Sequence, residues 1–157
     1  MLTSNAISEM RLKINDRDMV GLDDSELLSY LNEAIQFIAS AMITYKSPLC
    51  VKDIDMTEPT MVLPNNFAQL CGNYPVKITG KIISTSEDLP LTIRYFESFG
   101  DVELGGSLPF HHTALDKLAI KIGCIYAQNQ EHEEISQDKS LVNELQQMVA
   151  SALGVGA

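Results

Sequence analysis

Three histidines are the residues of this chain that could most readily bind a metal ion. His111 and His112 are adjacent, and His132 follows further along the chain. Adjacent residues of a helix point about 100° apart, so the pair cannot easily share one ion. No HExxH motif is present, and His132 stands among carboxylates in the polar sequence EHEE at 131–134. We interpret that stretch as a solvated helix junction rather than a metal site.

Acidic residues and glycines offer no clearer chemistry. Asp53 and Asp55 would share one face of a strand, and Asp16 and Asp18 flank Arg17. Neither pair has the number of oxygen ligands or the central glycine of a calcium loop. The chain has no GxSxG elbow, no GxGxxG and no phosphate-binding loop with its lysine. We therefore predict that the protein is not an enzyme, with no catalytic residue, no metal and no cofactor.

The cysteines point to a reducing compartment. Cys50, Cys71 and Cys124 are an odd set without CxxC spacing, which argues against a disulfide framework or a zinc site. Cys124 lies in an apolar helical pattern and is most simply a small core residue. The first ten residues lack the pattern of a signal peptide, and the apolar stretches are short of a membrane span. We expect a protein assembled inside a cell, without a membrane partner.

Length and charge set the frame for the fold. The chain has 157 residues, 21 acidic and 11 basic, for a formal charge of −10, and a single domain over 1–157 is the default. The negative charge is spread along the chain, with no basic patch, which argues against tight binding to nucleic-acid phosphates. Solubility is the simplest interpretation of the charge.

One helix is specified almost position by position. Asp23 with Glu26 forms the pattern of a capping box, flanked by Leu22 and Leu27 as a hydrophobic staple. Pro48 disfavours helical geometry at the residue before it and so ends the helix. Between these signals, apolar residues recur at helical spacing. We expect this stripe to be buried against other helices, at positions that include Leu31, Ile35 and Ile38.

Three further segments show the same periodicity and supply packing partners. They are residues 5–14, 109–128 and 136–153. Ser107 and Pro109 give the start signal of the second, and Gly154 suits the residue after the end of the third. The polar link between the last two is short, which favours antiparallel neighbours.

The middle of the chain is richer in strand-forming residues. The best strand candidates are VKITGKIIS at 76–84 and LPLTIRYF at 89–96, with TSEDLP as a hairpin loop between them. We therefore predict a mainly α fold. It is a small antiparallel bundle of about four helices over 5–46 and 109–153, with a short β-rich insertion at about 50–104 between helices 2 and 3.

Two stretches resemble a known family. MRLKINDRDMVGLDDSELLSYLNEAIQFIA, from residue 10, resembles the start of the head-to-tail adaptor proteins of tailed bacteriophages, also called head-completion or tail-accessory proteins. There, an Arg-x-x-x-Asn-Asp turn leads into an acid-capped helix with an Asn-Glu-Ala core. MVLPNNFAQL, from residue 61, looks like the family's strand that ends in Leu-Pro before an aromatic residue. The matching positions are Arg11, Asn15, Asp16, Asn32, Glu33, Ala34, Leu63, Pro64 and Phe67.

The resemblance implies a structural virion protein at the capsid–tail junction, assembled in the host cytoplasm. Such proteins form a homo-oligomeric ring, here expected to hold twelve copies, between the portal protein and a tail or nozzle protein. They are similar to the gatekeeper ring of short-tailed phages: they help seal the packaged head, dock the tail and pass double-stranded DNA without binding it specifically. For such a ring, the candidates for partner contact are Arg94, Tyr95, Leu153 and Val155, and those for the DNA channel are Glu131, Glu133 and Glu134.

Two other functions fit the same residues. The chain could be a free-standing intracellular helical interaction module, which a discrete ring in native mass spectrometry would contradict. It could also be a small metal-dependent enzyme using one of the histidines, which a purified protein without stoichiometric metal would contradict.

Overall fold

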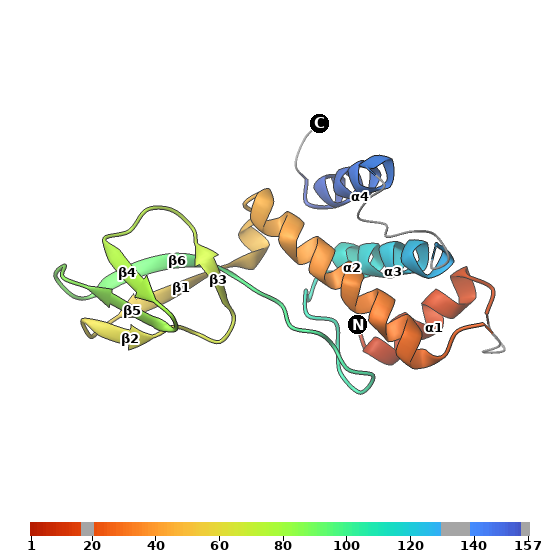
Figure 1. Cartoon of the computed structure of the whole chain (residues 1–157), viewed down its shortest axis with the longest axis horizontal. Coiled ribbons are helices and arrows are strands. Elements are labelled where there is room, and N and C mark those ends of the chain that lie inside the picture. The colour runs from red at the N-terminus through yellow and green to blue at the C-terminus, as the bar shows by residue number, and fades with distance from the viewer. Residues whose placement is uncertain (17–20, 130–138, 155–157) are drawn as a thin grey trace. The chain divides into compact units, whose positions relative to one another are not determined.

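The computed structural model describes residues 1–16, 21–129 and 139–154. Within these ranges the chain forms four α-helices and six strands (Figure 1). It divides into two compact units. Met1–Tyr45 with Phe99–Ala157 is the helical unit, and Lys46–Ser98 is the β unit.

The helical unit contains α1 (Thr3–Lys13), α2 (Asp24–Thr44), α3 (Thr113–Gln128) and α4 (Lys139–Ala152). The predicted capping box of α2 is confirmed: the Glu26 backbone N–H donates to Asp23 Oδ1 at 2.8 Å, and Glu26 Oε2 accepts from the Asp23 N–H at 2.8 Å. α3 begins four residues after Pro109, because the His112 side chain caps it and His111 has a positive φ of 50°.

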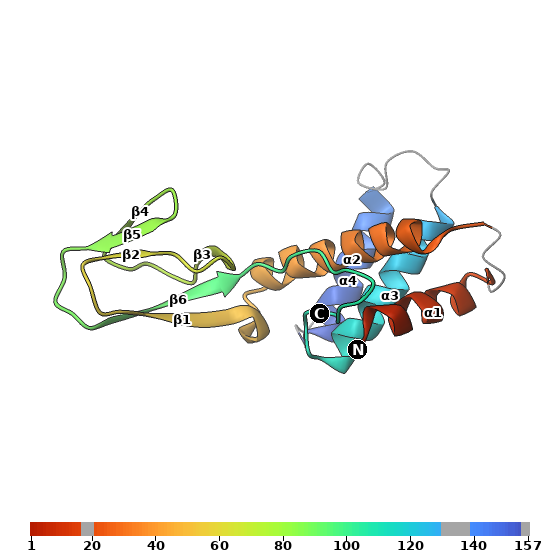
Figure 2. The same cartoon turned by 90° about the horizontal axis from the view of Figure 1, so that it is seen from below.

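The core of this unit lies where α1, α2 and α3 meet, with α4 packed on α2 and α3 (Figure 2). Leu31, Ile35 and Ile38 are fully buried, as predicted. At Gly123 in α3, an added Cβ would lie 3.5 Å from Leu31 Cα and 3.0 Å from Met10 Cε. The missing side chain thus lets the helices approach closely. None of the helices in the described ranges has the length and apolar character needed to cross a membrane.

The β unit starts with a short 3-10 helix, η1 (Pro48–Cys50), and contains two antiparallel sheets. One has the order β1 (Val51–Met56), β6 (Leu91–Glu97), β3 (Phe67–Leu70). The other has the order β2 (Thr60–Val62), β5 (Ile82–Thr85), β4 (Val76–Thr79). Both sheets contribute to one apolar core of buried residues: Ile54, Met56, Leu63, Ile83, Ile93 and Tyr95.

The prediction of a mainly α bundle with a short β insertion is therefore wrong. Four helices are accompanied by two three-stranded sheets, and the β unit buries a hydrophobic core of its own. The sheets were not evident from the sequence, because several strands have only three or four residues, too few for a clear alternation of apolar and polar side chains. The expected single domain over 1–157 stays a prediction beside these two units.

The predicted hairpin was also wrong. The stretch VKITGKIIS is two strands, β4 and β5, joined at Gly80-Lys81, with Thr79 opposite Ile82. Gly80 has φ 60°, as glycine does at the first position of a two-residue type II′ turn. β6 pairs instead with β1 and β3. The stretch TSEDLP therefore connects two different sheets.

Candidate functional site

A buried arginine holds the first two helices of the helical unit together. Arg11 is 5% exposed. Its Nη2 donates to Asp24 Oδ1 at 2.6 Å and its Nε donates to the same oxygen at 3.2 Å. Its Nη1 donates to Asp16 Oδ2 at 3.1 Å and to the Leu22 carbonyl oxygen at 2.8 Å. The planar guanidinium thus contacts α2, the turn after α1 and the residues before α2 at the same time.

Asp16 extends this network into the backbone. Its carboxylate accepts from the Gly21 N–H and the Leu22 N–H, both at 3.0 Å. Asn15 has φ 58°, and the Asp16 N–H donates to the Arg11 carbonyl at 3.0 Å. Three of the residues that carry the family resemblance therefore form a structural joint after α1.

A second group of contacts binds α2 to an irregular segment, residues 99–112, which we call the strap. Asn32 Nδ2 donates to the Val102 carbonyl at 3.1 Å, and Asn32 Oδ1 accepts from the Val102 N–H at 2.8 Å. Gln36 Nε2 donates to the Phe99 carbonyl at 2.8 Å. Both ends of the Asn32 amide are therefore satisfied by one residue of the strap, which fixes its register along α2.

The far part of the strap is held by the start of the chain. The Thr3 N–H donates to the Gly106 carbonyl at 3.0 Å, and the Leu108 N–H donates to the Met1 carbonyl at 2.9 Å. Within the strap, the rings of Phe99 and Phe110 meet edge to face, with centroids 5.2 Å apart. The strap thereby connects the start of α1 with the middle of α2.

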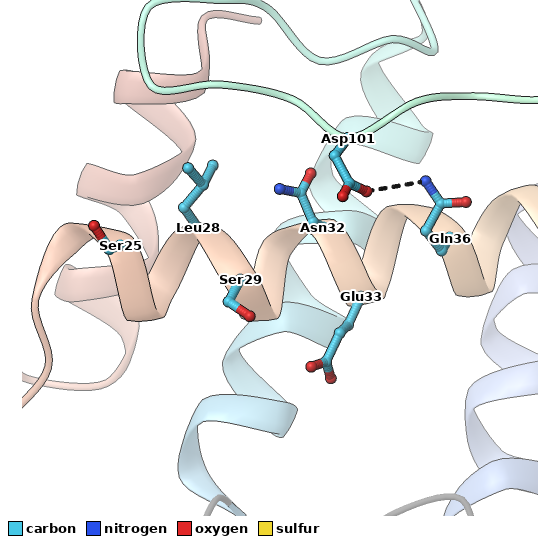
Figure 3. Close-up of a pocket in the computed structure, with 7 residues that line it drawn as sticks. All are labelled: Ser25, Leu28, Ser29, Asn32, Glu33, Gln36 and Asp101. Carbon is cyan, nitrogen blue, oxygen red and sulfur yellow. Dashed lines mark hydrogen bonds between the residues drawn. The ribbon is translucent and has the colours of Figure 1, made fainter.

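A polar groove of about 620 Å³ lies beside α2 and the strap. In Figure 3, Asn32 and Gln36 point toward Asp101 of the strap, whereas Glu33 points to the other side of α2. Gln36 Nε2 lies 3.4 Å from Asp101 Oδ1. The groove therefore presents hydrogen-bonding groups and the Asp101 carboxylate on the strap side of α2. Its lining residues are Ser25, Leu28, Ser29, Asn32, Glu33, Gln36 and Asp101.

Glu33 influences two neighbouring phenols. Burial raises the pKa of Tyr126, and the Glu33 carboxylate raises it further. Burial also raises the pKa of Tyr30, with Glu33 and Glu26 adding to the effect. Both phenols therefore stay protonated at neutral pH. Ala34, the third residue of the Asn-Glu-Ala motif, is fully buried.

The Leu-Pro motif of the β unit forms a locked turn. Leu63 is buried, and the Phe67 N–H donates to the Pro64 carbonyl at 3.1 Å. The Phe67 ring packs on Tyr95, with centroids 5.5 Å apart. Asn66 joins the turn to β6: its Oδ1 accepts from Tyr95 Oη at 3.0 Å, and its Nδ2 donates to Glu97 Oε2 at 3.1 Å.

These contacts correct one predicted partner residue. Tyr95 is 4% exposed and faces the core of the β unit, so its ring is not available to a partner. Arg94, on the opposite face of β6, is exposed and lies 3.4 Å from Asp53 Oδ1. Leu153 is half-buried after α4. The predicted residues that lie outside the described ranges are Glu131, Glu133, Glu134 and Val155.

Cys50, Cys124 and His112 take structural positions. Burial raises the pKa of Cys50 and of Cys124 to about 11, and Cys71 is partly exposed. His112 Nδ1 accepts from the Leu115 N–H at 3.4 Å at the start of α3. In the described part of the chain, no three His, Cys, Asp or Glu side chains gather as a metal site would need.

Sequence reasoning missed the strap and its amide contacts. Asn32 and Gln36 are four residues apart on a helix and so share a face. Two amides at that spacing are a usable signal, because an amide can pair with the N–H and C=O of one extended residue.

No known protein family matches the chain, and no curated protein matches it.

Proposed function

We propose that this protein is a structural adaptor of a tailed bacteriophage, which forms a homo-oligomeric ring between the portal and the tail. The observation that carries the proposal is the structural role of the residues on which the resemblance rests. Arg11, Asp16 and Asn32 hold connections between segments of the helical unit. Residues that serve to fix the shape of a subunit suit a scaffold protein.

The β unit supports the same proposal. Phe67 and Leu63 of the Leu-Pro motif help to pack a core separate from that of the helices. A subunit with two separate cores can use one unit for neighbouring copies and present the other to a partner. In the proposed function these partners are the portal protein and the tail or nozzle protein.

The acidic character of the chain suits DNA passage. Each copy carries a formal charge of −10, and a closed ring repeats every surface carboxylate around its axis. DNA phosphates within about 8–10 Å, the Debye length at physiological salt, would be repelled by such a wall. Glu131, Glu133 and Glu134 remain our proposed channel residues.

The test is reconstitution with the portal protein encoded in the same genome. We expect electron microscopy of the mixture to show a ring of this protein on one end of the portal, and filled heads carrying the ring to accept tails. The matched control omits this protein and should leave portals bare and heads unjoined. A protein that remains separate from the portal during gel filtration, and does not affect head–tail joining, would contradict the proposed function.

A further inference from the structure

The outward face of one sheet in the β unit carries an apolar pair that the fold does not bury. Val62 on β2 and Ile82 on β5 are cross-strand partners, and antiparallel partners project to the same side of a sheet. Val62 is 68% exposed and Ile82 is 40% exposed. The intervening positions Met61 and Ile83 face the core, so this pair lies on the solvent side.

The pairing sets Val62 and Ile82 apart from the other exposed apolar residues. Single exposed aliphatic side chains are common on protein surfaces, and the remaining ones in the described ranges are single positions on other segments. They are Leu2, Leu12, Leu49 and Leu104. Val62 and Ile82 instead form one contiguous patch on a sheet face, at the end that adjoins the turn between β4 and β5.

The surroundings of the pair are polar and basic. Lys77 lies on the same face, in the row with Thr60 and Ser84, and Lys81 stands in the turn at its border. Neither lysine forms an ion pair with any described residue. Glu87 lines the shallow groove at one end of this face. The apolar pair therefore lies beside polar and basic groups, and contact surfaces commonly combine the two.

The other sheet of the same unit has the opposite character. Its outward face carries Asp53 and Asp55 on β1, both exposed, with Arg94 and Thr92 opposite them on β6. Among the strand residues, two aspartates and one arginine lie on this face, whereas Lys77 is the charged strand residue on the outward face of the first sheet. The outward faces of the two sheets therefore differ in the sign of their net charge.

We propose that the Val62–Ile82 face binds the Asp53–Asp55 face of a second copy of this chain. The contact joins two different surfaces of the same protein, so it is heterologous, and such contacts repeat from copy to copy until a ring closes. The inference deepens the proposed function and rests on it, because a ring supplies the second copy.

The size of the face indicates how strong this contact is. Three strands about 4.8 Å apart, with about four residues each at 3.4 Å, cover on the order of 200 Å². A stable interface uses about 800 Å² per partner. The sheet contact therefore acts together with others in the ring, and its removal should weaken association without abolishing it.

The first experiment measures self-association of the full chain by sedimentation velocity over a range of concentrations. The variant V62T/I82T keeps β-branched side chains in both strands, so it should fold normally by circular dichroism. We expect its association to be about tenfold weaker than that of the unchanged protein. The control L12Q/L104Q removes two exposed apolar residues of the helical unit and should associate normally.

The second arm tests charge pairing at about 10 mM salt, where the Debye length is about 30 Å. K77E and D55K should each associate more weakly than the unchanged protein. A 1:1 mixture of the two should recover, because each contact then joins opposite charges. A photo-crosslinking residue at Ile82 should label peptides from residues 51–56 or 91–97 of another copy.

Three results would overturn the inference. They are equal association of V62T/I82T and the unchanged protein, no association of the unchanged protein up to high concentration, and crosslinks from Ile82 solely to the helical unit or to the portal. Each leaves portal binding as a separate measurement. If the chain associates with itself as expected but does not bind the portal, the proposed function is contradicted and the inference about the two sheet faces is not.

Discussion

Arg11 connects three parts of the helical unit through one side chain. It contacts Asp24 at the start of α2, Asp16 in the turn after α1 and the Leu22 carbonyl. Buried charge networks of this kind contribute little compared with well-packed apolar residues, but removing one partner leaves the others uncompensated. We therefore expect that removing Arg11 destabilises the fold by more than the intact network stabilises it.

Substituting Arg11 tests this reasoning. R11M should lower the free energy of unfolding by about 3–5 kcal/mol, because the ion pairs of Arg11 with Asp16 and Asp24 and its hydrogen bond to the Leu22 carbonyl are lost. The free energy of unfolding of R11K should lie between those of R11M and the unchanged protein, since lysine keeps the charge but lacks the planar guanidinium. The control K13M changes an exposed cation on the same helix and should have little effect. Chemical denaturation measures all three, and an unaltered midpoint for R11M would exclude the structural role of the network.

The buried cysteines give a pH dependence with a definite sign. Burial raises the pKa of Cys50 and Cys124 to about 11 in the folded chain, from a usual value of 9.0. The folded state therefore holds these protons more tightly than the unfolded state. Their stabilising effect is complete below pH 9 and is lost as the pH rises toward 11.

We expect the melting temperature to fall between pH 9 and 11, and the double variant C50A/C124A to show a smaller fall over the same range. At pH 8, a thiol reagent should modify Cys71 first and the two buried cysteines after unfolding. Rapid modification of all three in the native protein would contradict the burial of Cys50 and Cys124.

At the scale of residues, the sequence pointed to Arg11, Asp16 and Asn32 but not to the groups that they contact. Arg11, Asp16 and Asn32 were selected by resemblance, yet their contacts depend on a turn and a strap that have no periodic signal. Tyr95 was assigned wrongly to the surface. Its spacing of two from the buried Ile93 placed it on the core face of β6, and the predicted hairpin obscured that alternation.

At the scale of elements, α2 and β5 show why helices were predicted well and strands poorly. The start of α2 follows from its capping box, which is local in sequence. The helix ends at Thr44, two residues before Lys46, whose φ is 52°, and four residues before Pro48. β5 has four residues and pairs with β2, about twenty residues earlier in the chain, as well as with β4 across a two-residue turn. The prediction treated 76–84 as one strand and so missed the turn at Gly80. A short strand therefore becomes visible only with its neighbours.

The packing of α2 gives a quantitative expectation. I35A removes a fully buried side chain between helices and should lower the free energy of unfolding by about 2–5 kcal/mol. The control S40A lies on the exposed side of the same helix and should change it little. Equal stability of I35A and the unchanged protein, measured in urea, would be inconsistent with the packing of α2.

The turn between β4 and β5 gives another quantitative expectation for stability. Gly80 has φ 60°, and no atom lies within 4 Å of the place that a Cβ would occupy, so any cost of substitution is conformational. G80V should destabilise the β unit by about 1–3 kcal/mol. G105V is the matched control, because Gly105 also has open space but lacks the positive φ. If thermal melts of the two variants coincide, the turn does not need glycine.

At the scale of the whole molecule, the sequence predicted a short β-rich insertion where the structure has two three-stranded sheets. The expected limits were about 50 and 104, and the β unit spans 46–98. Its independence comes from a core built by residues of both sheets, which requires pairing between distant strands. Hydrophobic periodicity along one segment cannot reveal that arrangement.

Replacing residues 46–98 by a short Gly-Ser linker tests the division into units. We expect the shortened chain to keep a strong helical circular dichroism signal and a cooperative melt, because α1, α2, α3 and α4 retain their mutual contacts. Removing residues 80–92 instead serves as a contrast: it deletes β5, the middle strand of one sheet, and should expose the core of the β unit. A shortened chain without cooperative unfolding would show that the helices depend on the β unit.

The strap and the first helix have a consequence for synthesis on the ribosome. The β unit is one continuous stretch and is complete as soon as Ser98 has emerged. The helical unit is made of two separate stretches of the chain. The hydrogen bond from Thr3 to Gly106 and the ion pair between Glu9 and Lys117, at 2.7 Å, can form only after Gly106 and Lys117 have emerged. Until α3 emerges, the apolar stripe of α2 has no partner from that helix. A nascent chain that stalls before α3 therefore exposes the apolar stripe of α2, and exposed apolar surface of this kind is recognised by chaperones and proteases.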